Sequence, residues 1–127
     1  LELVKKMKSK NIKIKKSKVL IMGLTFKEDC PDIRNSGVEK IVSKLKKLNC
    51  QLDLYDPYVG KKETKDIYNI SPKLKFFRNN YDAVVISVAH KQFKKIGLKK
   101  IRGLCKKNHV IFDLKNLFNS SKVDFKL

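Results

Sequence analysis

The sequence predicts a three-layer α/β domain with a mostly parallel sheet and helices on both faces. Short apolar runs that suit strands alternate along the chain with segments whose apolar residues recur at helical spacing. This alternation is typical of parallel strands joined by crossover helices. At 127 residues, the chain is long enough for a single domain with a core of its own. We expect residues 18–127 to form this domain, and residues 1–17 to be the end of a preceding helix and a lead-in.

The first helical pattern and the first strand stand at the amino end. Apolar residues at spacings of three predict the tail of a helix over residues 1–8. Val19–Met22 is a run of apolar residues that suits a strand covered on both faces. Gly23 then permits a sharp exit from the strand, because a glycine has no side chain to crowd the turn.

A polar turn follows the first strand and has the character of an anion-binding corner. It contains Lys27 and Arg34, whose positive charges we expect to face the same negative ligand. Pro31 disfavours an early start of the next helix, whereas Asn35 and Ser36 can cap it. The free N–H groups at the amino end of that helix would also point toward a negative ligand.

The middle of the chain contains a helix, a second strand and a long connection. Over residues 38–48, apolar residues fall at helical spacing and lysines occupy the other faces, which predicts an amphipathic helix. Residues 51–55 alternate as a second strand, which we expect to stop at Asp56-Pro57. Residues 58–73 are predicted to form a polar connection that wraps the rim of the sheet.

The remaining pattern predicts two strands with helical turns between them. Residues 82–88 form the central apolar strand, and residues 93–104 form one or two helical turns interrupted by Gly97. Residues 110–114 form the final strand, which precedes a polar tail.

Polar residues at or just beyond the predicted strand ends indicate one crevice. Lys27, Asp56, His90 and Lys115 occupy such positions, and ligands of open α/β sheets bind outside the carboxyl ends of the strands. The crevice does not have the features of a dinucleotide site, because the first turn contains only Gly23 and lacks the G-x-G-x-x-G fingerprint. We therefore interpret Asp56 as a cap of the following turn rather than a ribose-binding acid, and His90 as a structural residue.

Six residues around the first turn form a long motif of fixed spacing. They follow the pattern G-x-x-F-K-x-(three residues)-D-x-R-x-S and are Gly23, Phe26, Lys27, Asp32, Arg34 and Ser36. This motif resembles that of the carboxy-terminal domain of the UDP-glucose/GDP-mannose dehydrogenase family. The neighbouring residues are similar to the branch that acts on UDP-N-acetylhexosamines. The resemblance covers roughly residues 10–118, and it implies a Rossmann-like fold.

The resemblance implies roles for four residues. Phe26, Lys27 and Lys115 would contact the nucleotide of a UDP-sugar, and Arg34 would reach toward an NAD cofactor that is bound mainly by an amino-terminal domain missing here. Three of these roles have a simpler alternative. Phe26 can fill the core under the turn and Lys27 can be one more solvated lysine. Arg34 can pair with a nearby carboxylate, an interaction worth at most about 1 kcal/mol on an exposed surface.

The three cysteines indicate a reducing compartment and not catalysis. Cys30, Cys50 and Cys105 are odd in number, far apart and free of any C-x-x-C pairing. The family's catalytic cysteine belongs to a motif that precedes this domain, and none of these three matches it. We therefore predict no catalytic residue and no metal ligand in this chain. No secretory signal and no apolar run of about 18 residues is found, so we expect a cytoplasmic protein.

The formal net charge of +19 permits nucleic acid, phosphate ligands or an anionic membrane as partners. Among the basic residues only Arg34, Arg78 and Arg102 are arginine, whereas phosphate recognition favours the planar guanidinium. The lysines are also scattered through every predicted element. We interpret the charge as a general lysine-rich composition, with a focused functional patch as the alternative, and we expect neither nucleic-acid nor membrane binding.

The resemblance implies the UDP-binding domain of an NAD-dependent nucleotide-sugar 6-dehydrogenase, an oxidoreductase that converts a UDP-hexose or UDP-N-acetylhexosamine to the uronic acid for polysaccharide biosynthesis. Its partners would be the UDP-sugar and the amino-terminal NAD-binding and central helical regions of the same enzyme, which forms a homo-oligomer only at full length. This chain alone is predicted to be inactive. Two alternatives remain open: a stand-alone nucleotide-binding or regulatory module without catalysis, and a basic nucleic-acid-binding protein.

Overall fold

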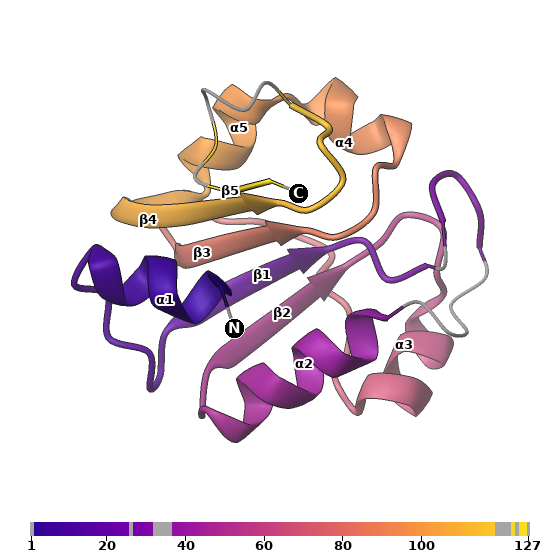
Figure 1. Cartoon of the computed structure of the whole chain (residues 1–127). Helices are drawn as coiled ribbons and strands as arrows, with labels where there is room; N and C mark the ends of the chain where they lie inside the picture. Colours follow the sequence, from indigo (N-terminus) through magenta and orange to yellow (C-terminus); the bar gives the residue numbers. More distant parts are fainter. Residues whose placement is uncertain (1, 26, 32–36, 119–122, 124, 127) are drawn as a thin grey trace.

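A parallel sheet forms the centre of the molecule (Figure 1). The computed structural model describes residues 2–25, 27–31, 37–118, 123 and 125–126. Within these ranges the sheet has five strands in the order β2-β1-β3-β4-β5, and every neighbouring pair is parallel. The strands are β1 (Lys18–Met22), β2 (Gln51–Tyr55), β3 (Tyr81–Ile86), β4 (Cys105–Asp113) and β5 (Phe125–Lys126). The helices are α1 (Glu2–Ser9), α2 (Val38–Lys47), α3 (Lys61–Tyr68), α4 (Lys91–Ile96) and α5 (Leu98–Gly103).

Helices cover both faces of the sheet, as the sequence predicts. The chain leaves β1 through α2 and reaches β2 on one side, whereas it leaves β3 through α4 and α5 and reaches β4 on the other side. Because crossovers between parallel strands are right-handed, these opposite directions place the helices on opposite faces. Figure 1 shows α4 and α5 above the strands and α2 and α3 below them.

Alternate strand residues fill two separate cores. Val19 and Ile21 of β1 belong to a buried cluster with residues of α1 and α2. Leu20 and Met22 point the other way and belong to a second cluster with residues of α4 and α5. A strand with both faces buried must be apolar at every position, which is why the apolar run of β1 identified it from the sequence.

The helix after the first turn begins at a glycine. Gly37 is the N-cap residue of α2 and has a φ of 79°, in the left-handed region. The predicted caps, Asn35 and Ser36, lie outside the described residues. Val38, Val42 and Leu45 then bury one face of the helix, as its apolar spacing predicts.

Two segments differ from the sequence prediction. The connection predicted over residues 58–73 contains α3, in which only Thr64 and Tyr68 are buried, so the helix has too few apolar positions to show a helical period. The last strand is longer than residues 110–114, because β4 begins at Cys105. Its first half is polar and mostly exposed and therefore has no apolar signature. A further short strand, β5, follows in the predicted polar tail.

The order of the strands determines where a ligand can bind. β1 and β3 are neighbours, but their crossovers leave in opposite directions. Such a switch point opens a crevice beyond the carboxyl ends of the two strands. Within the described ranges, no helix is long and apolar enough to cross a membrane.

Candidate functional site

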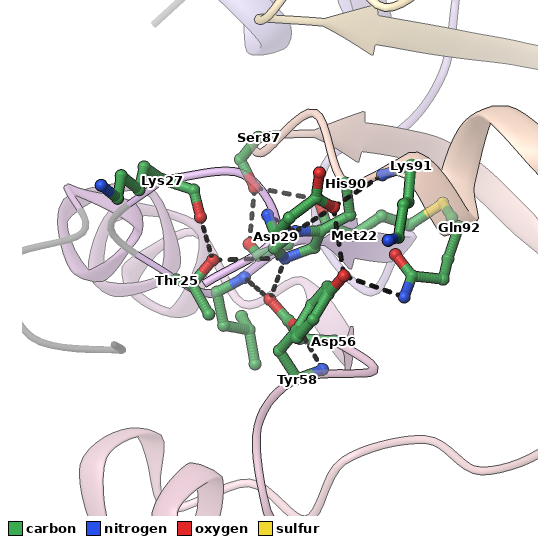
Figure 2. A network of polar contacts seen from close by, with 12 residues as sticks. Met22, Thr25, Lys27, Asp29, Asp56, Tyr58, Ser87, His90, Lys91 and Gln92 are labelled. Atoms are coloured by element: carbon green, nitrogen blue, oxygen red, sulfur yellow. Dashed lines mark hydrogen bonds and ion pairs between the residues drawn. The ribbon is translucent and has the colours of Figure 1, made fainter. Parts of the chain in front are cut away.

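A buried histidine joins the ends of three strands at this switch point (Figure 2). His90 follows β3, and its side chain is completely buried. Its Nε2 atom lies 2.8 Å from Oδ2 of Asp56, which follows β2, and 3.2 Å from Oγ1 of Thr25, which follows β1. Its Nδ1 atom lies 2.8 Å from the backbone nitrogen of Asp29. One imidazole ring therefore connects the loops beyond β1, β2 and β3.

The surrounding groups fix which ring nitrogen carries the proton. The N–H of Asp29 donates to Nδ1, so Nδ1 is an acceptor and the proton of a neutral ring sits on Nε2. The Thr25 hydroxyl donates to the carbonyl of Lys27 over 2.9 Å, so its oxygen shares the single Nε2 proton with Oδ2 of Asp56, which is the nearer acceptor. Both nitrogens of His90 are thus engaged within the protein. This supports a structural role for His90 rather than acid–base catalysis.

The Asp56 carboxylate accepts hydrogen bonds from three directions. The N–H of Leu24 donates to Oδ2 over 2.7 Å, and the N–H of Tyr58 donates to Oδ1 over 2.8 Å. The third donor is Nε2 of His90. The contact with Tyr58 is the turn cap that the sequence predicts. The other two contacts tie the turn after β2 to the turns after β1 and β3.

A second layer of contacts lies nearer the surface. The N–H of Lys91 and the Tyr58 hydroxyl donate to Oδ1 of Asp29 over 3.0 Å and 3.2 Å. Gln92 Nε2 donates to the Tyr58 hydroxyl over 3.0 Å. The N–H of Lys91 is the largest of the causes that lower the pKa of Asp29, so this carboxylate is ionised at neutral pH. The turn that carries the sequence motif is thus held at both Thr25 and Asp29.

Gly23 is required by a close backbone approach. Its φ is 103°, and a Cβ atom at this position would lie 2.7 Å from both the nitrogen and the Cβ of Val88. The Ser87 hydroxyl donates to the Gly23 carbonyl over 2.7 Å. The glycine therefore permits the exits of β1 and β3 to pack together, and Val88 occupies the space beside it.

The structure describes two of the four predicted site residues. Lys27 is exposed, and Figure 2 shows its ammonium group pointing away from the network. Lys115 is also exposed and follows β4 at the same edge of the sheet, since the N–H of Leu114 donates to the carbonyl of Ile86 at the end of β3. Among the described contacts, none joins Lys115 to the network. Phe26 and Arg34 lie outside the described residues.

Of the four strand-end residues predicted to converge, Asp56 and His90 make direct contact, and Lys27 is connected to them through Thr25. The sequence interpretation did not assign Thr25, Asp29, Tyr58 or Ser87 to the site. Each of them lies within a few residues of a strand end, which is the signal that could have found them.

The cysteines have no common site in the described part of the chain. Cys50 precedes β2 and Cys105 begins β4, so both stand at the amino ends of strands, opposite the network. Cys30 lies within the motif, between Lys27 and Asp32, and none of the three forms a disulfide. A search of the described residues finds no group of three metal-ligating side chains.

Comparison with known proteins identifies the family. Residues 20–120 match the model of the UDP-glucose/GDP-mannose dehydrogenase family, UDP binding domain. The chain belongs to this family. It is 41% identical over 126 residues to UDP-N-acetyl-D-glucosamine 6-dehydrogenase from Salmonella typhi and 42% identical over 126 residues to the protein of the same name from Pseudomonas aeruginosa. Each match covers 99% of this chain and 30% of the relative, so the chain spans about a third of the relatives' length.

Solved structures of related dehydrogenases have the same fold. UDP-D-ManNAc dehydrogenase from Pyrococcus horikoshii superposes with a TM-score of 0.76 at 24% identity, over 98% of this chain and 28% of that one. The UDP-N-acetyl-mannosamine dehydrogenase from S. aureus gives a TM-score of 0.67 at 27% identity, over 98% of this chain and 29% of that one. These matches confirm the resemblance seen in the motif, and they give no support to a stand-alone module or a nucleic-acid-binding protein.

Proposed function

We propose that this UDP-binding domain serves an NAD-dependent dehydrogenase that oxidises a UDP-N-acetylhexosamine, or a UDP-hexose, to the uronic acid. Relatives named as UDP-N-acetyl-D-glucosamine and UDP-N-acetyl-D-mannosamine dehydrogenases support this choice of substrate class. The observation that carries the proposal is the motif turn, which the His90 network holds rigidly at the switch point while Lys27 faces outward.

The proposed binding mode uses positively charged side chains at the carboxyl ends of the strands. Lys27 forms no ion pair within the described residues, so its ammonium group is available to a diphosphate. A charge-assisted hydrogen bond of this kind is stronger than one between neutral groups. Lys115 lies at the same edge, and we propose that Lys115 and Phe26 contact the same UDP-sugar.

The described residues do not fit a dinucleotide site. The first turn has a single glycine and lacks the G-x-G-x-x-G fingerprint with which Rossmann domains bind a pyrophosphate. We therefore propose that NAD binds mainly to the amino-terminal region of the complete enzyme, and that Arg34 reaches toward it from this domain. NAD, when bound, would accept the hydride from the sugar alcohol.

The remaining proposals concern the complete enzyme. Residues 1–17 connect this domain to a central helical region, and the full-length protein forms a homo-oligomer. It acts in the cytoplasm, where it supplies nucleotide-sugar acids for polysaccharide biosynthesis. This chain alone has no dehydrogenase activity, because the three cysteines lie outside the catalytic motif of the family.

The first test concerns Lys27. We expect UDP to bind this chain weakly, and Lys27→Ala to weaken the binding by about 1–3 kcal/mol, the scale for loss of a charge-assisted hydrogen bond. Calorimetry or ligand-observed NMR can measure this difference. Lys40→Ala, which removes an exposed lysine of α2, is the matched control and should leave the affinity unchanged. Equal affinities for the Lys27→Ala protein and the unchanged chain would remove Lys27 from the site.

A further inference from the structure

We propose that a groove on the α5 side of the sheet binds an organic phosphate that carries a flat or apolar group, such as a nucleoside diphosphate. The groove lies between residues 74–78 and helix α5, and its volume is about 800 Å³. Small-molecule sites have volumes of roughly 300–1,000 Å³. It is separate from the polar side chains of the strand-end network; Met22, whose carbonyl accepts from the Ser87 hydroxyl, lies between the two.

The floor of the groove is apolar. Met22 and Leu104, both buried members of the second core cluster, lie beneath it, and the half-buried rings and chains of Phe76 and Ile96 form its sides. Leu74 stands at the rim with 80% of its surface exposed, the largest exposure of any large hydrophobic residue that the structure describes. An exposed apolar residue beside an apolar floor indicates a contact surface.

Positive charge surrounds this floor. Lys75 and Arg78 lie on one wall, and Lys99 and Lys100 lie on the opposite wall at helix α5. All four are exposed. In the part of the chain that the structure describes, none of the four forms an ion pair.

The surrounding sequence supplies almost no negative charge. From residue 67 to residue 112 the only carboxylate is Asp82. Its Oδ2 atom already accepts from the Lys106 ammonium over 3.2 Å and from the N–H of Lys18 over 2.8 Å. The helices on the other face differ, because α1, α2 and α3 all contain acidic residues: Glu2, Glu39, Glu63 and Asp66. Both faces contain lysines, but helices α4 and α5 contain no acidic residue, so nearby carboxylates do not offset the positive charge around the groove.

The arrangement selects a particular ligand chemistry. Four like charges around one groove repel each other, and a multivalent anion relieves this repulsion better than a single carboxylate does. Arg78 adds a planar guanidinium, which matches the geometry of a phosphate. An inorganic phosphate would leave the apolar floor unused. A phosphate attached to a ring or an apolar chain satisfies both the walls and the floor.

The experiment uses adenosine diphosphate as the probe, with the same chain labelled for NMR. We expect amide shifts at residues 74–78 and 96–104, and a tighter affinity than for inorganic pyrophosphate or for adenosine. Replacing both α5 lysines, Lys99→Gln with Lys100→Gln, should weaken binding about tenfold or more, as expected for loss of charge-assisted contacts. The matched pair Lys61→Gln with Lys62→Gln, two exposed lysines of α3, should change it less than twofold.

A second variant tests the apolar part of the groove. Leu74→Ser should weaken the binding of adenosine diphosphate several-fold and leave the binding of pyrophosphate unchanged. Ile67→Ser, at an exposed position of α3, should change the binding of neither. Lys27→Ala should also leave adenosine diphosphate binding intact, which separates this groove from the proposed UDP-sugar site.

Three results would overturn the proposal. Equal binding of pyrophosphate and adenosine diphosphate would mean an adventitious ion only. Equal losses for the α5 and α3 lysine pairs would mean diffuse attraction by the net charge. Preferential binding of a glutamate-rich peptide at the same amides would identify a protein partner instead of a small phosphate.

Discussion

The strand-end network and the groove beside α5 use polar groups in opposite ways. In the network, the polar atoms of His90, Asp56 and Thr25 form hydrogen bonds within the protein. Few of their donors and acceptors remain for a ligand. In the groove, Lys75, Arg78 and the α5 lysines surround an apolar floor without carboxylate partners in the described chain. The network therefore positions a binding turn, whereas the groove itself offers unused charge.

This difference has an energetic consequence. Buried polar groups that are fully hydrogen-bonded contribute to stability only as a complete set, and loss of one member leaves the others unsatisfied. Exposed charges contribute little to stability, since water solvates them. Substitutions in the network should therefore change stability and ligand binding together, and substitutions in the groove should change binding alone.

The largest effect is expected at Asp56. Asp56→Ala leaves the N–H groups of Leu24 and Tyr58 without their acceptor and removes the nearer acceptor of the buried His90 ring, which should cost about 3–5 kcal/mol of unfolding free energy. UDP binding should weaken too, because the turn that carries Lys27 loses its anchor. Urea denaturation followed by circular dichroism measures the first effect. The exposed Asp66→Ala on α3 is the control, expected within about 0.5 kcal/mol of the unchanged chain. Full stability of Asp56→Ala would show that the network does not hold the turn.

A smaller effect is expected at Tyr81, a buried residue at the amino end of β3, opposite the strand-end network. Its hydroxyl donates to Oδ2 of Asp53 over 2.6 Å, so Tyr81→Phe should cost about 1 kcal/mol and leave UDP binding unchanged. Burial, and then the Asp53 carboxylate, raise the pKa of Tyr81. The folded state thus favours the protonated phenol, and this stability is present below about pH 10, the ordinary tyrosine pKa, and lost above it. Urea titrations at neutral and alkaline pH should show a smaller loss of stability in Tyr81→Phe than in the unchanged chain; some loss should remain, because burial and then Asp56 also raise the pKa of Tyr55.

The smallest effect on stability is expected at the groove. The pair Lys99→Gln with Lys100→Gln should change the unfolding free energy by less than about 0.5 kcal/mol, since both side chains are exposed and without acidic partners in the described chain. Thermal and urea unfolding of this double variant, compared with the unchanged chain, provides the measurement. A marked destabilisation would mean that these lysines support the fold, and the contrast between the two regions would fail.

The sequence by itself determined the elements whose side chains form a clear pattern. The apolar run of β1, the helical spacing of α2 and the interruption at Gly97 are all local signals, and the structure confirms them. The strand-end positions of Asp56 and His90 were likewise readable, because parallel strands bring their carboxyl ends to one edge. The motif that begins at Gly23 was specific enough to indicate the family.

Only the tertiary structure decided what the strand-end residues do. The proton position on His90 depends on Asp29 and Asp56, which are 61 and 34 residues away in the chain. Helix α3 was missed because its stability comes from two buried contacts and not from a visible period. The groove is a property of the fold too, since residues 74–78 and helix α5 are separated in sequence and meet only when both pack on the same face of the sheet. The spacing of apolar residues shows which side of a single helix or strand is buried. A site between elements depends on which helices and strands the chain topology brings together, and the sequence does not show this directly.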